Sequence, residues 1–233
     1  MRLLIIVPTY NEIENIESLL ADIFSKSSDA HVLVVDDNSP DGTSAVVEKI
    51  AERNSSVFLL RRSVKQGVAS AFLEGFSWGI SNDYELFLAM DADFSHDPKY
   101  IPALLKAVEH SDLVIGSRIV SGGGVKNRSF IRNFLTKASS VYCKIILNCP
   151  IKDFTGGYNL WRKSTLEKIG IESVFSRGYS FQIEMKYKAY KHKCSIVEIP
   201  IIFQDRIKGT SKMPAAYLFK ALIDVFKIRK LVK

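Results

Sequence analysis

The sequence predicts an α/β fold built on a doubly wound, mostly parallel sheet with helices on both faces. Three observations predict it. Apolar runs of strand length alternate with amphipathic segments of helix length as far as Arg118. The runs are continuously apolar rather than alternating, which indicates strands that are covered on both faces. Polar and charged residues follow the runs directly, as expected where strands end at a ligand-binding edge.

Each apolar run is expected to be one strand. The five runs are RLLIIVPTY, HVLVVDD, VFLLRR, YELFLAM and DLVIGSR, at residues 2–10, 31–37, 57–62, 84–90 and 112–118. Helices are expected between them at residues 11–26, 44–54 and 68–80, and from Pro98 onward. Asn11, with Glu14 three residues later, is the expected N-cap of the first helix. Asp97 is the expected cap of the fourth, because Pro98 suits the first helical position.

The second half of the chain is less regular. A polar, glycine-rich loop is expected at residues 120–129, a helix at 133–147, and a turn at the two glycines of DFTGGYNLWR. KCSIVEIPIIF reads as a strand broken at Pro200. The tail is expected to be helical. No repeat or linker divides the chain, so we expect one domain over residues 1–212 (halves 1–118 and 119–212), followed by a basic amphipathic helix at 213–233.

Composition limits the possible functions. The chain has 233 residues, of which 47% are hydrophobic and 24% charged, as in a soluble globular protein. A net charge of +7 suits a polyanionic partner such as a nucleotide, a nucleic acid or an acidic membrane. No aromatic-basic or helix-turn-helix motif supports nucleic acid. The three cysteines are too few and too scattered for a disulfide framework or a zinc site. We expect no signal peptide and no transmembrane helix.

An acidic cluster follows the fourth predicted strand, in LAMDADFSHDP. Asp91 and Asp93 are two residues apart, so in an extended chain they point the same way and can share Mg²⁺ or Mn²⁺. A solvated strand end or a helix cap is the alternative, and Asp97 fits the cap. The rule for parallel sheets brings this cluster to the same edge as Pro8, Asp37 and Arg118. Neither the P-loop nor the dinucleotide-binding glycine pattern is present, so a bound diphosphate would need a metal and side chains.

Seven motifs in order give a more specific reading. IVPTYNE, VVDDNSPDGT, MDADFSHDP, GSR, DFTGGYNL, GYSFQIEM and FQDRIKGTSK together closely resemble the family-2 glycosyltransferases, and specifically their dolichol-phosphate (polyprenol-phosphate) mannosyltransferase group. The resemblance runs from about Ile6 to Lys212. It implies a GT-A type fold, with donor binding in the first half of the domain and acceptor binding in the second.

The resemblance also implies roles for individual residues. Donor-nucleotide contacts are expected from Pro8, Tyr10, Glu12, Val35, Asp37, Asp91, Ala92 and Asp93, and metal contacts from Asp91, Asp93 and Ser95. Contacts to the sugar and the acceptor phosphate are expected from Arg118, Arg132, Arg206 and Lys212. The catalytic set would be Asp91, Asp93, Arg118 and Arg206. Ser95 departs from relatives that carry Gln, and no Trp occurs near residues 122–133. His96 is expected at the surface near the site.

The implied activity is a metal-dependent, inverting transfer of a hexose, mannose from GDP-mannose, to a dolichyl or undecaprenyl phosphate. The protein would act peripherally at the cytoplasmic face of a membrane, directly or through a membrane-anchored partner. A UDP-sugar donor or another acceptor is the alternative within the enzyme class. A non-catalytic sugar-nucleotide-binding protein is the alternative outside it. The C-terminal helix, with Phe219, Leu222 and Phe226 on one face, either lies in a membrane interface or packs on the core.

Overall fold

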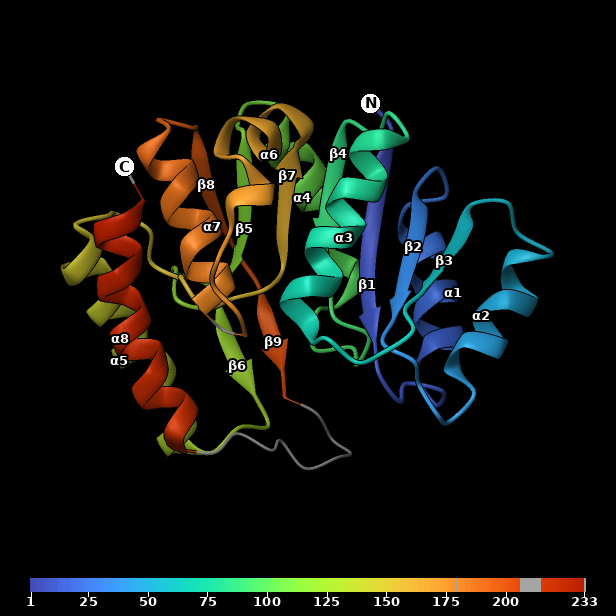
Figure 1. The fold of residues 1–233 in the computed structure, drawn as a ribbon, viewed down its shortest axis with the longest axis horizontal. Coiled ribbons are helices and arrows are strands. Elements are labelled where there is room, and N and C mark those ends of the chain that lie inside the picture. The colour runs from blue at the N-terminus through green and yellow to red at the C-terminus, as the bar shows by residue number, and fades with distance from the viewer. Residues whose placement is uncertain (179, 206–214, 233) are drawn as a thin grey trace.

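The computed structural model describes residues 1–178, 180–205 and 215–232, and its main feature is a seven-stranded sheet in the order β3-β2-β1-β4-β7-β5-β8 (Figure 1). All strand pairs are parallel except those of β7, which runs antiparallel to β4 and β5. The strands are β1 (Leu3–Thr9), β2 (His31–Asp36), β3 (Val57–Arg61), β4 (Leu86–Ala89), β5 (Leu113–Ser117), β7 (Asn159–Arg162) and β8 (Ile196–Pro200). The predicted α/β class with a mostly parallel sheet is therefore confirmed.

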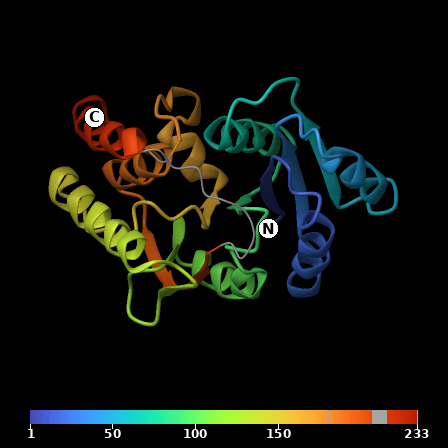
Figure 2. The same cartoon turned by 90° about the horizontal axis from the view of Figure 1, so that it is seen from below.

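Helices cover both faces of the sheet and enclose a separate apolar core on each side (Figure 2). One core is closed by α1 (Ile16–Lys26), α2 (Thr43–Ala51) and α4 (Ile101–Val108). The other is closed by α3 (Val68–Ser81), α5 (Phe130–Leu147), α6 (Lys163–Ile169), α7 (Ser180–Lys191) and α8 (Ala215–Leu231). Successive residues of β1 contribute to opposite cores, which is why its sequence is apolar without a break.

Several local predictions are confirmed. Strands β1 to β5 lie within the five predicted runs, and the chain breaks at Pro200, after which β9 (Ile202–Gln204) pairs with β6 (Gly124–Lys126) in a separate two-stranded sheet. The Asp97 side chain accepts a 2.9 Å hydrogen bond from the Lys99 amide and caps the 3₁₀ turn Pro98–Tyr100 that leads into α4. The strand break at Pro200 and the Asp97 cap are decided by local sequence, because each depends on adjacent residues, whereas the pairing of β6 with β9 joins distant segments.

The predicted start of the first helix was wrong. Helix α1 begins at Ile16, and Asn11 has a left-handed backbone with φ of 61°. The Asn11 amide donates to Ser39 Oγ and the Glu12 amide to Thr43 Oγ1. These bonds to the loop after β2 and to the first residue of α2 replace the first helical turn, so the segment before α1 is held against a distant part of the chain.

Two other segments contain strands that the sequence did not predict. Residues 120–129 were expected to form a loop, but β6 lies within them. DFTGGYNLWR was expected to form a turn, but it also supplies β7. Leu160 of β7 pairs with Leu88 of β4 and Val114 of β5, so this strand fills the gap between them. A strand of four residues is too short to be recognised from the periodicity of its apolar residues. This segment becomes a strand because β4 and β5 both have edges that it can pair with.

The C-terminal helix packs on the core through Val225 and Ile228, and Val232 directly after the helix is buried as well. The predicted apolar face is not the packed face, because Leu222 and Phe226 are 42% and 55% exposed. Helix α8 therefore joins the core and also leaves apolar side chains in solvent. No helix within the described residues is long and apolar enough to cross a membrane.

Candidate active site

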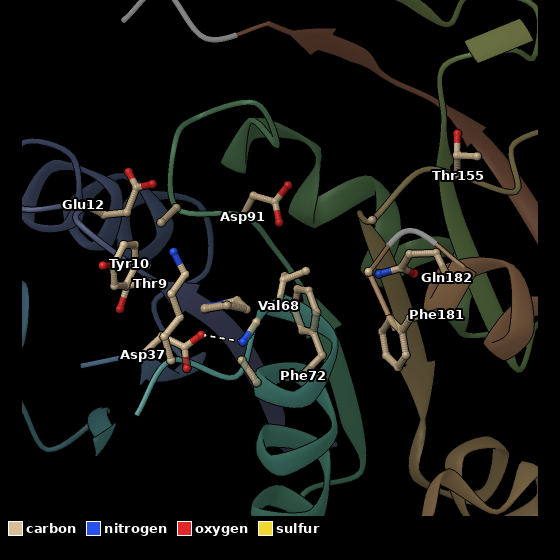
Figure 3. A pocket seen from close by; sticks show the side chains of 17 residues that line it. Thr9, Tyr10, Glu12, Asp37, Val68, Phe72, Asp91, Thr155, Phe181 and Gln182 are labelled. Carbon is tan, nitrogen blue, oxygen red and sulfur yellow. Dashed lines mark hydrogen bonds between the residues drawn. The ribbon is translucent and has the colours of Figure 1, made fainter. Parts of the chain in front are cut away.

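A cavity of about 440 Å³ opens at the carboxyl ends of β1 and β4 (Figure 3). Six of the predicted donor-site residues line it: Pro8, Tyr10, Glu12, Asp37, Asp91 and Ala92. These residues come from three separate sequence motifs, and they meet because the carboxyl ends of parallel strands lie at the same edge of the sheet. Val35 does not line the cavity, because it is fully buried in β2 beside Pro8 of β1.

Asp37 is held by the loop that precedes α3. Its carboxylate accepts from the amides of Gly67 at 2.8 Å and Gln66 at 3.3 Å, and it forms an ion pair with Arg62. Gly67 has φ of 91°, a conformation that side chains disfavour, and this positive φ positions the amide. The Arg62 side chain is only 3% exposed. A buried arginine thus fixes the carboxylate at one end of the cavity.

The neighbouring Asp36 stabilises the same edge of the sheet through hydrogen bonds to the loop after β2. It is buried and accepts hydrogen bonds from the side chains of Thr9, Ser39 and Ser44 and from the Ser39 amide. Burial alone would raise the pKa of Asp36, but these donors outweigh it and hold the pKa below its ordinary value. Asp36 stays ionised and holds the loop together, while Asp37 faces the cavity.

The walls of the cavity are partly aromatic and partly cationic. Lys65 places its ammonium 3.4 Å from the centre of the Tyr10 ring. On the other side Phe72 of α3 and Phe181 of α7 are parallel, with ring centroids 6.3 Å apart (Figure 3). Glu12 accepts a 2.8 Å hydrogen bond from Asn15, which fixes its carboxylate at the rim. The cavity therefore offers flat apolar surface beside charged groups, as sites for ring-bearing polar ligands do.

The acidic cluster lies directly after β4. Asp91 lines the cavity, and Asp93 accepts a 3.0 Å hydrogen bond from the Ser95 amide. His96 is not at the surface as predicted. It is 2% exposed, is stacked on Tyr158 at 4.8 Å, and accepts the Asp91 amide on Nδ1 at 2.9 Å. Its proton is therefore on Nε2. Burial lowers the pKa of His96, and the carboxylates of Asp91 and Asp93 only partly oppose this, so a neutral imidazole positions the Asp91 backbone.

The cluster fits a hard divalent cation. Within the described residues no group of three or more His, Cys, Asp or Glu side chains forms a complete metal cage. Mg²⁺ and similar ions usually take one or two carboxylates and complete their shell with water and substrate phosphates. Ser95 Oγ is buried and has no hydrogen-bond partner among the described residues, so this oxygen is available to a ligand. Asp91, Asp93 and Ser95 together match the ligand chemistry of such an ion.

Arg118 lies at the end of β5 in a buried ion pair with Asp153. Its Nε and Nη2 donate to the two carboxylate oxygens of Asp153 at 2.8 and 2.7 Å, and Nη2 also donates to Thr155 Oγ1 at 2.7 Å. Asp153 is completely buried. Its burial would raise its pKa, but Arg118 and, more weakly, Lys186 hold the pKa far below its usual range. The guanidinium is thus locked in one orientation.

A second basic group lies beside β6 and α5. Arg132 donates to Asp205 at 2.9 Å, and Arg128 also forms an ion pair with Asp205 at 3.6 Å. Arg132 remains 40% exposed. The other two predicted basic residues, Arg206 and Lys212, lie outside the described residues.

Sequence reasoning missed several residues that build this site. Asp153 and Phe181 were visible only as parts of motifs, and Arg62, Lys65 and Phe72 carried no signal of their own. Their places depend on which loops and helix ends meet at the sheet edge. The structural role of a buried charged residue can be recognised only once the fold shows which groups surround it.

The chain matches known proteins over most of its length. Residues 4–170 match the family model described as glycosyl transferase family 2. The chain is 41% identical over 225 residues to an undecaprenyl-phosphate mannosyltransferase of Micrococcus luteus, covering 97% of this chain and 93% of that protein. It is also 41% identical over 226 residues to a polyprenol monophosphomannose synthase of Mycolicibacterium smegmatis, covering 96% and 85%.

Solved structures share the fold at low identity. Glucosyl-3-phosphoglycerate synthase from Mycobacterium tuberculosis superposes with a TM-score of 0.67 at 16% identity, over 98% of this chain and 78% of that one. A mannosyltransferase from Pyrobaculum calidifontis, determined with GDP-Man and Mn²⁺, superposes with a TM-score of 0.63 at 19% identity, over 99% and 73%. The fold is therefore of the GT-A type, and the chain is a glycosyltransferase that belongs to glycosyl transferase family 2.

Proposed function

We propose that the protein transfers a mannosyl group from GDP-mannose to a polyprenyl phosphate, with inversion at the anomeric carbon. The observation that carries the proposal is the presence of opposite charges at one edge of the sheet: the carboxylates of Asp91 and Asp93 follow β4, and the guanidinium of Arg118, held by Asp153, follows β5. The names of the two relatives at 41% identity support the sugar and the lipid acceptor.

The donor would occupy the cavity, with its nucleoside toward Tyr10 and Asp37 and its diphosphate toward Asp91 and Asp93. Asp91, Asp93 and Ser95 would hold Mg²⁺ or Mn²⁺, which when bound supplies positive charge that stabilises the departing nucleoside diphosphate. His96 keeps Asp91 in place through its backbone amide. Asp37 is fixed by Arg62 and the Gly67 amide, so it offers a preorganised acceptor for nucleoside hydroxyl or N–H groups.

The acceptor side needs cations rather than a base. A lipid monophosphate is already ionised at neutral pH, so attack requires that the phosphate be held in line behind the anomeric carbon. Arg118 and Arg132 are our candidates for this, together with Arg206 and Lys212. A hydroxyl acceptor would need a general base, and His96 is unsuited to that role because its Nδ1 is already occupied by the Asp91 amide.

We also propose that the protein works peripherally on the cytoplasmic face of a membrane, where its lipid acceptor lies. Helices α5 and α8 lie side by side, joined by the hydrogen bond from Tyr142 to the Leu222 carbonyl (Figure 1). Their outer sides expose many large apolar side chains: Phe130, Ile131, Phe134, Val141, Ile145, Leu222, Ile223, Phe226 and Leu231. Exposed basic residues flank them at Lys137, Lys144, Lys227 and Lys230. Apolar groups bordered by cations suit an anionic lipid surface.

The deciding experiment incubates the purified protein and Mn²⁺ or Mg²⁺ with radiolabelled GDP-mannose, UDP-glucose or UDP-GlcNAc and a polyprenyl phosphate in detergent. Label from GDP-mannose should enter the organic phase, and the anomeric configuration of the product should be inverted. If label from a UDP-sugar entered the organic phase instead, the donor would be that UDP-sugar and the assignment of GDP-mannose would be wrong. No transfer from any donor with either metal would overturn the proposal.

The metal assignment has a separate test. Asp93→Ala should abolish transfer and weaken Mn²⁺ binding, measured by titration calorimetry in the presence of the nucleoside diphosphate, while the circular dichroism spectrum is unchanged. Asp97→Ala is the matched control, because Asp97 caps the next turn and should affect stability rather than metal binding. Near-normal Mn²⁺ affinity in Asp93→Ala would refute the assignment.

A further inference from the structure

A buried lysine of α7 lies directly behind the candidate site. The Lys186 side chain is completely buried. Its ammonium donates to the backbone oxygens of Asp153 at 2.8 Å, Gly156 at 2.7 Å and Phe154 at 3.3 Å. A protonated amine has three hydrogens to donate, so these three carbonyls satisfy it fully. Lys186 therefore ties the turn at residues 153–156 to α7.

This turn carries the carboxylate that orients Arg118. The Asp153 side chain accepts from the Gly156 amide at 2.9 Å within the turn, and from Arg118 Nε and Nη2 across it. Arg118 Nη1 has no hydrogen-bond partner among the described residues, so it is the nitrogen left for a ligand. The direction of Nη1 depends on Asp153, and the position of Asp153 depends on the turn that Lys186 holds.

The electrostatics favour a role beyond packing. Lys186 and Arg118 both interact with the carboxylate of Asp153, so two cations are buried close to one another. Burial lowers the pKa of Lys186 to about 8, and the attraction of Asp153 only partly opposes this. Glu198, which accepts the Asp153 amide, and Cys143 of α5 also face the cluster. An apolar residue in this place would avoid the cost of burying the charge.

We infer that Lys186 is a positioning residue for Arg118: by holding the 153–156 turn it directs the free guanidinium nitrogen toward the transferred sugar or the acceptor phosphate. This inference rests on the proposed function for its chemical meaning. Lys186 is completely buried, so its effect on Arg118 passes through the 153–156 turn, whose Asp153 and Thr155 side chains both accept hydrogen bonds from Arg118.

The same helix supplies a matched control. Lys188, two residues further along α7, is also buried and also ties down a turn, donating to the Ile169 and Gly170 carbonyls and to Ser173 Oγ. That turn follows α6 and makes no contact with Arg118 in the described hydrogen bonds and ion pairs. Lys188→Met therefore removes a comparable buried cation without disturbing the proposed chain of contacts.

The experiment compares Lys186→Met with Lys188→Met, both checked for folding by circular dichroism. In Lys186→Met, kcat for transfer should fall about 100-fold while KM for the sugar nucleotide changes little, because the error is one of orientation at the reacting groups. In Lys188→Met both should stay within about threefold of wild type. A general loss of folded protein would instead lower activity in both variants in proportion to the unfolded fraction.

A spectroscopic readout makes the inference independent of turnover. In ¹⁵N-labelled protein the Nε–H resonance of Arg118, assigned by its loss in Arg118→Lys, should be slow to exchange because of its bond to Asp153. It should broaden or vanish in Lys186→Met and persist in Lys188→Met. An unchanged resonance in Lys186→Met, or an equal loss in both variants, would overturn the inference. If the wild type transfers no sugar, the proposed function fails, and the resonance still decides the role of Lys186.

Discussion

Replacing Asp153 by Asn should destabilise the protein strongly, because this carboxylate serves two buried cations. Its oxygens accept four hydrogen bonds: from the Arg118 amide, Arg118 Nε, Arg118 Nη2 and the Gly156 amide. In Asp153→Asn one carboxylate oxygen is replaced by an NH₂ group, which cannot accept the hydrogen bonds that this oxygen accepted. Arg118 and Lys186 also lose their shared counter-charge. Removing one partner of a buried ion pair typically costs about 3–5 kcal/mol.

For a chain of this length, such a loss corresponds to a fall in Tm of about 6–20 °C. Thermal and urea unfolding followed by circular dichroism at pH 7.5 would measure it. Asp83→Asn is the matched control. Asp83 pairs with Lys163 at the surface with its side chain 89% exposed, so its free energy of unfolding should change by less than about 0.5 kcal/mol. A loss below about 1 kcal/mol in Asp153→Asn would refute the reasoning.

The pH dependence gives a second check on the same variant. The pKa of Asp153 is lowered in the folded protein, so its ionisation contributes stability above the unfolded pKa of about 3.9, and this contribution is lost as pH falls toward the folded value. The gap in unfolding free energy between wild type and Asp153→Asn should therefore be widest near neutral pH and narrow in acid below about pH 4. A gap that stays constant into acid would show that charge does not cause the difference.

Three further outcomes are expected. Phe134→Ser combined with Ile145→Ser should reduce co-sedimentation with anionic lipid vesicles while Tm changes little, because both side chains are exposed; undiminished sedimentation would exclude this face as the contact. Gly79→Ala should destabilise by about 1–3 kcal/mol in urea unfolding, because its Cβ would lie 2.4 Å from a β4 ring, and an unchanged midpoint would contradict this packing. Burial raises the pKa of Cys143 to about 12 and of Cys149 to about 11, so in native protein at pH 8 these thiols should react with a chromogenic disulfide far more slowly than the third, partly exposed one. Rapid reaction of all three would contradict that burial.

The fold class and the sheet edge that carries the site could both be predicted from the sequence alone. Continuous apolar runs require cover on both faces, and parallel strands bring their carboxyl ends together, so Pro8, Asp37, Asp91 and Arg118 were expected at one edge. Asp97 was correctly read as a cap, because capping depends only on adjacent residues. The family was recognisable from the order of its motifs.

The surroundings of these residues could not be predicted locally, because they depend on which distant segments pack together. His96 looked like a surface residue, yet it is buried beneath Asp91, and Asn11 looked like a helix cap, yet its amide bonds to a distant loop. Strand β7 forms because its backbone can pair with β4 on one side and with β5 on the other. The partners of Arg118 and the position of Lys186 also come from segments distant in sequence. Local patterns report the intrinsic preferences of a segment, whereas burial and pairing are set by what packs against it, and that is a property of the whole fold.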